Sequence, residues 1–265
     1  MPAARQTGET MIRESLGKVI HMPLMNKVNS RVFPRIAAGI ALALLVAACS
    51  DSGNDATEAS DSSTSQTTVD PVTTSAVDLP AADGDVDMAE VLKPGPMKEM
   101  ALGEADAPVK IVEYMSMTCP HCAAFHNDTF KQIVTDYVDT GKVQFIVREF
   151  PFDPRATAAI MLARCAPEDQ FFPMIEVLMQ QQSNWARAED AAGALFDISK
   201  LAGFTQESFN ACLTNQQLVD DVNAVRKKAA EDFGVQSTPT FLINGKRYPG
   251  NMTVESMSAL IDSLL

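Results

Sequence analysis

The sequence predicts an α/β fold with an inserted all-helical domain, and three observations lead to this class. A strand, a helix and a second strand follow one another within residues 109–149, the order of a βαβ unit with parallel strands. A long series of helical patterns fills residues 154–233. A hairpin and a closing helix in residues 234–265 can then complete the sheet that the first two strands begin.

The N-terminal segment has the pattern of an export signal. Basic residues precede the apolar run "RIAAGIALALLVAAC", which ends in small residues at Cys49 and is shorter than the about 20 residues of a membrane-spanning helix. Residues 1–48 are therefore predicted to be a signal peptide with an over-long start, which Met22 or Met25 would shorten. "VAAC" resembles the lipobox of bacterial lipoproteins, and this implies that Cys49 becomes the lipidated N-terminus. Ordinary cleavage nearby and an uncleaved anchor are the alternatives.

The next segment predicts a disordered acidic tether. Residues 49–92 are rich in Ser, Thr, Asp and Ala and contain few large apolar side chains, so burial cannot offset the entropy of ordering. Residues 49–265 carry 15 basic and 32 acidic residues, a net charge of −17. Such a charge argues against nucleic acid or an anionic membrane surface as a partner.

The first strand is predicted from "VKIVEYMSM", residues 109–117, which is short, apolar and β-branched at its start. Every second residue faces the same side of a strand, so one face holds four apolar residues and a single acid, Glu113. "CPHCAAFHNDTFKQIVTDYVDT" then shows helical spacing and ends before Gly141, and "KVQFIVREF" reads as a second buried strand.

The second half begins with helices and ends with a hairpin. Asp153 suits a helix N-cap and Pro154 the first helical position. In "TPTFLINGKRYPG", Asn244-Gly245 predicts the two-residue turn of a hairpin. The last helix, "TVESMSALIDSLL", has Thr253 as its cap.

The five cysteines divide into one leader residue and two candidate pairs. If Cys49 carries lipid, four remain in an oxidising compartment, and four allow three pairings. The spacing of Cys119 and Cys122 suits a strained, reducible bond. Cys165 and Cys212 lie in helical stretches and are then left for each other, so a structural bridge between two helices is predicted. The alternative is two free buried thiols.

A specific resemblance joins the first pair to a later motif. Cys119-Pro120-His121-Cys122 stands at a strand-to-helix junction, and "STPTF" follows far along the chain before the hairpin. Together they resemble DsbA-type thiol–disulfide oxidoreductases. The resemblance implies a thioredoxin-like fold with an inserted helical domain. The predicted organisation is signal 1–48, tether 49–92, thioredoxin-like part 93–153, helical insertion 154–233 and second thioredoxin-like part 234–265.

Physical chemistry supports the roles that this family assigns to the quartet. Unpaired N–H groups at a helix N-terminus favour a thiolate at Cys119, and the thiolate is the reacting species. Pro120 takes the first helical position, where its missing donor costs nothing. His121 offers a positive or hydrogen-bonding partner to the sulfur, and Cys122, one step into the helix, is the resolving thiol. A purely structural disulfide is the alternative.

Three further residues take roles from the same resemblance. Pro239 matches the family's cis-proline, which exposes the backbone of Thr238 to an extended substrate beside the disulfide. Glu113 matches the buried acid that shuttles protons for the resolving cysteine, although the family's buried lysine has no clean match. The alternative is that Glu113 pairs with Lys142 or Arg148 across the sheet.

The predicted function is a monomeric disulfide donor for exported proteins that acts in the periplasm, tethered to a membrane by Cys49. It needs no cofactor, and the resemblance implies reoxidation by a DsbB-type, quinone-linked membrane partner. The same superfamily leaves isomerase and reductase activity open, and a redox-inactive metal-binding or chaperone lipoprotein is a further alternative. No metal site is predicted, because the zinc-type ligands Cys119, His121, Cys122 and His126 crowd one helix start without a second ligand pair. His126 itself reads as a surface or packing residue, and haem attachment would need a histidine where Ala123 stands.

Overall fold

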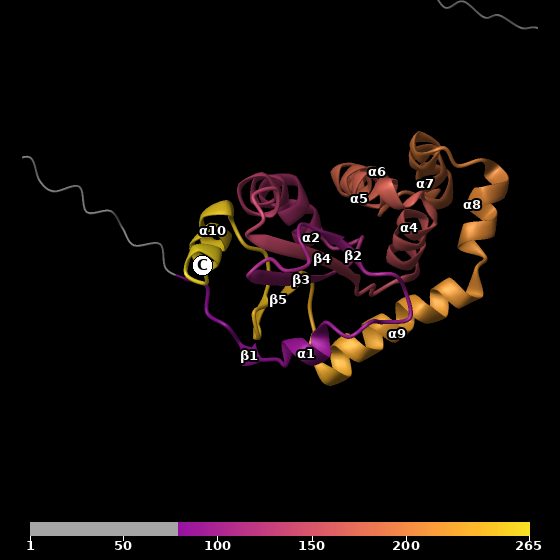
Figure 1. Ribbon diagram of the computed structural model, residues 1–265. Coiled ribbons are helices and arrows are strands. Elements are labelled where there is room, and N and C mark those ends of the chain that lie inside the picture. Colours follow the sequence, from indigo (N-terminus) through magenta and orange to yellow (C-terminus); the bar gives the residue numbers. More distant parts are fainter. Residues whose placement is uncertain (1–78) are drawn as a thin grey trace, which may run out of the picture. The chain divides into compact units, whose positions relative to one another are not determined.

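The computed structural model describes residues 79–265, which form one mixed sheet flanked by helices (Figure 1). The strand order across the sheet is β1-β6-β5-β3-β4-β2. The bounds are β1 Gly84–Asp85, β2 Met100–Leu102, β3 Val109–Met115, β4 Val143–Glu149, β5 Thr240–Ile243 and β6 Lys246–Pro249. β3 is parallel to β4 and antiparallel to β5, and β5 and β6 form the hairpin. The predicted α/β class, with helices inserted between β4 and β5, is confirmed.

The helical segment between β3 and β4 covers one face of the sheet. It consists of α2 (Pro120–Ala124) and α3 (Lys131–Ile133), which alternate with π-helical turns at Phe125–Phe130 and Val134–Val138. Phe125 is fully buried in the large core on this face, together with residues of α10 (Val254–Asp262). The segment is amphipathic, so burial of this side sets the direction in which it leaves the end of β3.

The opposite face is covered by α9 (Gln216–Asp232) and the short α1 (Met88–Val91), which Figure 1 shows across the sheet from α10. Val112 of β3 packs there in a smaller core with Ala229 of α9 and Val91 of α1. The sequence assigned all of residues 154–233 to a separate insertion. The end of α9 instead completes the layer over the sheet, and a helical pattern by itself does not reveal which surface a helix covers.

The remaining inserted helices form their own packed group. They are α4 (Pro154–Cys165), α5 (Phe171–Gln180), α6 (Gln182–Trp185), α7 (Ala191–Ser199) and α8 (Gln206–Leu213). Asp153 caps α4 by accepting hydrogen bonds from the backbone N–H groups of Arg155 and Ala156 at 2.9 and 3.0 Å. Trp185 is fully buried and donates its indole N–H to the carbonyl oxygen of Leu178 at 2.8 Å.

The expected tether boundary at residue 92 lies too far along the chain. Residues 79–92 include β1 and α1, and Val91 is fully buried. β1 pairs with the outer edge of the hairpin, where the Asp83 carboxylate accepts a hydrogen bond from Arg247 and that of Asp85 from Lys246. This short polar strand has no hydrophobic period of its own, and only an available sheet edge orders it. β2, at the other edge against β4, is apolar, but its three residues are too few to show a strand period, and it was also missed.

Candidate functional site

Cys119 and Cys122 lie after the end of β3, at the start of α2. Cys119 is the N-cap of α2 and is half-buried, Pro120 occupies the first helical position, and Cys122 is completely buried. Both cysteines are free thiols. The sulfur at the helix end is therefore accessible, whereas the sulfur one turn along is enclosed by the core.

The loop before β5 reaches the accessible sulfur. The peptide bond between Thr238 and Pro239 is cis, and the Cys119 thiol donates a hydrogen bond to the carbonyl oxygen of Thr238 with a sulfur–oxygen distance of 3.1 Å. β5 pairs antiparallel with β3 in the centre of the sheet. The loop that follows β3 and the loop that precedes β5 therefore meet at the same edge. Residues 119 positions apart are thus brought into direct contact.

The two thiols differ strongly in acidity. A hydrogen bond from Cys122 is the largest cause that lowers the pKa of Cys119, which falls from an ordinary value of 9.0 to about 5. Burial opposes this shift, while Thr238 and the backbone N–H groups of Cys122 and His121 add to it. The pKa of Cys122 is raised well above 9.0, first by burial, then by its hydrogen bond to Cys119 and by the charge of Glu113. The reactive thiolate therefore forms at Cys119.

His121 contributes to the site through its backbone, and the role expected for its imidazole stays a prediction. Its side chain is exposed, and the contribution that it makes to the lowered pKa of Cys119 is a hydrogen bond from its backbone N–H. A helix N-terminus offers such N–H groups whatever the side chain is. The sequence pointed to the imidazole because histidine is a typical partner of a thiolate.

Glu113 is buried beneath the cysteine pair and has an unexpected partner. Its Oε2 lies 2.9 Å from Nε2 of His126, and both side chains are almost fully enclosed. Its Oε1 is buried without a hydrogen-bond partner in the described part of the chain. The alternative pairing across the sheet is wrong: Arg148 binds Glu99 and the hydroxyl of Tyr114 instead.

The surface or packing interpretation of His126 is also wrong in part. The residue is 3% exposed and packs between aromatic rings, but its ring nitrogen contacts a carboxylate. The available signal was its position four residues after Cys122, which puts both on one helix face. His126 thus pairs with Glu113, and within residues 79–265 no group of three His, Cys, Asp or Glu side chains is placed to hold a metal ion.

Sequence reasoning missed Gln182, the first residue of α6. Its side-chain N–H groups donate to the carbonyl oxygens of Met117 and Cys119 at 2.8 and 2.9 Å. The inserted helices are thereby joined to the backbone of the cysteine loop. No local pattern could have indicated this residue, because its partners are more than 60 positions away.

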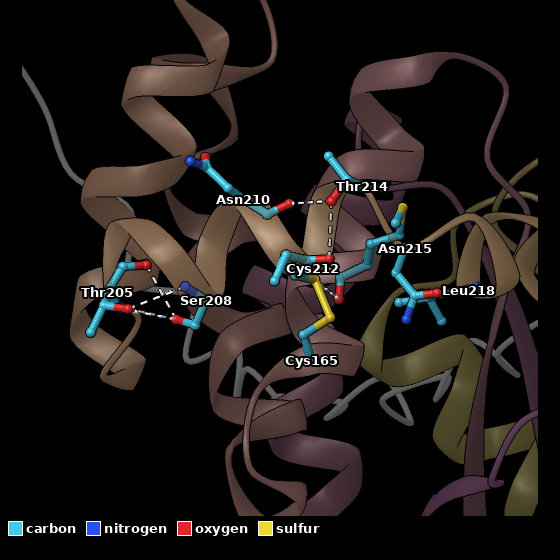
Figure 2. Close-up of a disulfide and its surroundings, with 10 residues drawn as sticks. Cys165, Thr205, Ser208, Asn210, Cys212, Thr214, Asn215 and Leu218 are labelled. Atoms are coloured by element: carbon cyan, nitrogen blue, oxygen red, sulfur yellow. Dashed lines mark hydrogen bonds between the residues drawn. A yellow bond between two sulfur atoms is a disulfide. The ribbon is translucent and has the colours of Figure 1, made fainter. Parts of the chain in front are cut away.

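The second cysteine pair lies apart from this site, within the inserted helices. Cys165, the last residue of α4, and Cys212 of α8 are joined by a disulfide whose Cα atoms are 6.0 Å apart (Figure 2). Figure 2 also shows the capping bonds of α8, between Thr205 and Ser208, and the turn at Thr214 that leads to α9. Cys49, the expected lipidation site, lies outside the described residues. Among the helices of residues 79–265, none has the length and apolar character needed to span a bilayer.

The fold and the site together define a class of protein: a thioredoxin-like sheet with helices inserted between its halves and a CxxC pair that faces a cis-proline loop. Residues 96–263 match the family model described as thioredoxin, so the chain belongs to the thioredoxin family.

The named relatives include proteins that act on disulfides. A Rickettsia felis protein provisionally named protein-disulfide oxidoreductase is 33% identical over 168 residues, which cover 63% of this chain and 60% of that protein. Disulfide bond formation protein D of Bacillus subtilis is 27% identical over 150 residues, 55% of this chain and 67% of that protein. The chain thus matches about three fifths of the length of its Rickettsia relative.

The solved structures include α-DsbA1 of Wolbachia pipientis. It is 29% identical to this chain, with a TM-score of 0.61, and the match covers 66% of this chain and 94% of that one. The fold is therefore that of DsbA proteins, with the helical insertion included.

Proposed function

We propose that this protein is a thiol–disulfide oxidoreductase that donates the Cys119–Cys122 disulfide to exported proteins. The observation that carries the proposal is the geometry of the pair: half-buried Cys119 caps α2 beside the Thr238 carbonyl oxygen, 3.1 Å from its sulfur, and Cys122 is fully buried. In these surroundings the pKa of Cys119 falls to about 5 and that of Cys122 rises well above 9.0. A stabilised thiolate at Cys119 favours the reduced pair, and a pair that is stable when reduced is a strong oxidant when its disulfide is formed.

The reaction follows from this asymmetry. A substrate thiolate attacks Sγ of Cys119, a mixed disulfide forms, and Cys122 leaves as a thiolate that takes up a proton. The second substrate thiolate then attacks the substrate sulfur of the mixed disulfide and displaces Cys119 as a stable thiolate. Two electrons pass to the cysteine pair. Of the two substrate thiol protons, one ends on Cys122 and the other in solvent.

Glu113 and His126 are proposed to carry the proton of Cys122. Support comes from the influence of the Glu113 charge on the pKa of Cys122 and from the 2.9 Å contact with His126. A carboxyl group with one unpartnered oxygen can give up and regain a proton, and a buried histidine beside it can hold the compensating charge.

Thr238 and Pro239 are proposed to align the substrate. The Thr238 carbonyl oxygen lies 3.1 Å from the reacting sulfur, so a polypeptide that pairs with this loop as an added strand would bring its own cysteine to Cys119. The substrates proposed are reduced exported proteins. A DsbB-type, quinone-linked membrane oxidase would restore the disulfide.

Export and anchoring are also proposals. The signal pattern of residues 1–48 and the "VAAC" that ends at Cys49 support a periplasmic protein held to a membrane by lipid. Replacement of Cys49 by alanine should release the mature protein into the soluble periplasmic fraction. Unchanged membrane association of that variant would contradict the anchor.

The central test is the oxidation of a peptide with two cysteines by the purified, oxidised protein. One peptide disulfide should form for each protein disulfide that is lost. The equilibrium with glutathione should give a potential above the about −270 mV of thioredoxin. A potential as low as that would favour a reductase, and repair of scrambled disulfides without net oxidation would favour an isomerase.

A further inference from the structure

A cavity of about 870 Å³, with both apolar and charged residues in its lining, opens beside the reactive cysteine. Thr118 and Pro120, the two chain neighbours of Cys119, line it on one side. The start of α4 and the α6 segment line it on the other, and they include Gln182, which binds the Cys119 carbonyl oxygen. The cavity therefore begins one residue from the sulfur that reacts with substrate.

The cavity is lined by two arginines, Arg155 and Arg187, without a carboxylate partner. Of the 15 Lys and Arg residues in the described part of the chain, ten lie within 4.0 Å of an Asp or Glu oxygen. Five do not: Lys110, Lys142, Arg155, Arg187 and Arg226. Two of these five thus share one cavity, in a protein whose charge is otherwise strongly negative.

Asp153, the single carboxylate of the cavity lining, offsets only one of the two positive charges. Asp153 accepts hydrogen bonds from the N–H groups of Arg155 and Ala156 as the cap of α4, and its other oxygen accepts one from the Thr118 hydroxyl at 2.5 Å. Arg155 uses one guanidinium nitrogen to bind the carbonyl oxygen of Ala186 at 2.8 Å, which holds it across the cavity. Arg187 is exposed at the opening. Guanidinium groups with free donors bind carboxylates, often through two hydrogen bonds.

We infer that this cavity is a substrate subsite for an acidic side chain, an Asp or Glu close to the cysteine that is oxidised. The inference rests on the proposed function and adds a substrate preference to it. Three extended residues span about 10 Å, so an acid within three positions of the cysteine can reach the cavity while the sulfur is at Cys119. The site selects substrates locally, against the repulsion that the acidic protein exerts at longer range.

The experiment compares peptides that differ only beside one cysteine, with Glu, Gln or Lys at the flanking positions. We expect kcat/KM to be highest for Glu and lowest for Lys, with about a fivefold contribution from each arginine, or about 1 kcal/mol, the upper range for an exposed pair. The ratio of kcat/KM between the Glu and Lys peptides should decrease as salt is added, because salt screens the charges. Equal rates for the three peptides in the wild-type protein would overturn the inference.

Substitutions of the two arginines test whether the preference for the Glu peptide comes from the cavity. Arg155→Gln with Arg187→Gln should remove the preference for Glu. Lys110→Gln removes another cation without a carboxylate partner, in β3, and should retain that preference. A preference that survives the double variant, or that Lys110→Gln abolishes equally, would refute the subsite. Arg187→Gln alone changes an exposed residue, so it provides the test if the double variant does not fold.

Two controls separate this inference from the proposed redox function. Oxidation of dithiothreitol, which has no acidic group, should proceed equally in all these variants and reports the cysteine chemistry alone. Peptides with serine in place of cysteine report binding alone, through the fluorescence anisotropy of a labelled peptide. If dithiothreitol is not oxidised, the redox function fails, and the Glu-peptide preference in binding still decides the subsite.

Discussion

The two cysteine pairs of residues 79–265 differ in almost every physical respect. Cys119 and Cys122 are separated by two residues and are free thiols at the junction between sheet and helix. Cys165 and Cys212 are separated by 47 positions and are joined between two helices. Each pair has one enclosed member, Cys122 or Cys212, but only the first pair consists of free thiols, one with a low pKa and one with a high pKa.

The difference shows that reactivity belongs to the surroundings of a cysteine. The first pair is set at a helix N-terminus, against the Thr238 carbonyl oxygen and above a buried acid, and each of these affects thiolate formation. In the second pair Cys212 packs among apolar helix residues, whereas Cys165, at the end of α4, is exposed (Figure 2). A disulfide there links two parts of the helical insertion, without the helix N-terminus, the cis-proline loop and the buried acid that surround the first pair.

The largest expected effect is the loss of activity when the first pair is broken. Cys119→Ser removes the sulfur that forms the mixed disulfide, so peptide oxidation should fall to the rate without protein. A double variant of the second pair, Cys165→Ala with Cys212→Ala, should still oxidise the peptide. Loss of activity in the double variant while it remains folded by circular dichroism would overturn the division of roles.

The second cysteine pair should matter more than the first for the free energy of unfolding, the reverse of their order for activity. Removing the Cys165–Cys212 bridge opens a loop of 47 residues and should lower the free energy of unfolding by roughly 2–4 kcal/mol, because the unfolded chain regains entropy. Urea denaturation of the oxidised protein and the double variant measures this. A change below about 0.5 kcal/mol would mean that the bridge adds nothing to the packing of α4 and α8.

Glu113→Gln is expected to slow the step at which Cys122 changes its protonation. Loss of a positioned general acid–base should cost roughly tenfold or more in the formation of the mixed disulfide at neutral pH, the step in which Cys122 leaves and takes up a proton. His126→Gln should have a smaller effect in the same direction, and both should leave the bridge intact. Stopped-flow kinetics over a range of pH provides the measurement. Unchanged kinetics in Glu113→Gln would restrict that residue to packing.

The smallest effect concerns the acidity of Cys119. Thiolate absorbance near 240 nm should titrate with a midpoint near pH 5. Cys122→Ala should raise this pKa more than His121→Ala, because Cys122 supplies the largest hydrogen-bond contribution and His121 supplies a backbone N–H that alanine retains. A larger shift in His121→Ala would show that the imidazole controls the thiolate.

The same titration predicts how the stability of the reduced protein depends on pH. The folded pKa of Cys119 is about 5 and the ordinary value is 9.0, so folding favours the thiolate. The stabilisation is complete above pH 9 and is lost as the pH falls through about 5. Cys119→Ser should lack this dependence. A reduced protein whose melting temperature follows that of Cys119→Ser across this window would contradict the lowered pKa.

The sequence by itself was enough to predict the fold class and the reacting atoms. Alternation in residues 109–117, helical spacing after Cys119 and the turn at Asn244-Gly245 are local patterns, and local sterics and burial interpret them without knowledge of the rest of the chain. The resemblance of the quartet and of Thr238-Pro239 to a known family then supplied the arrangement that joins them.

Only the tertiary structure decided which distant groups meet. It paired Glu113 with His126, set Gln182 against the Cys119 carbonyl oxygen, turned the end of α9 onto the sheet and ordered β1 along the hairpin. Each of these depends on the position of one element against another, and such contacts leave no periodic signal in either segment. A buried polar group takes whichever partner the fold brings within reach, because remaining unpaired costs more than any particular pairing.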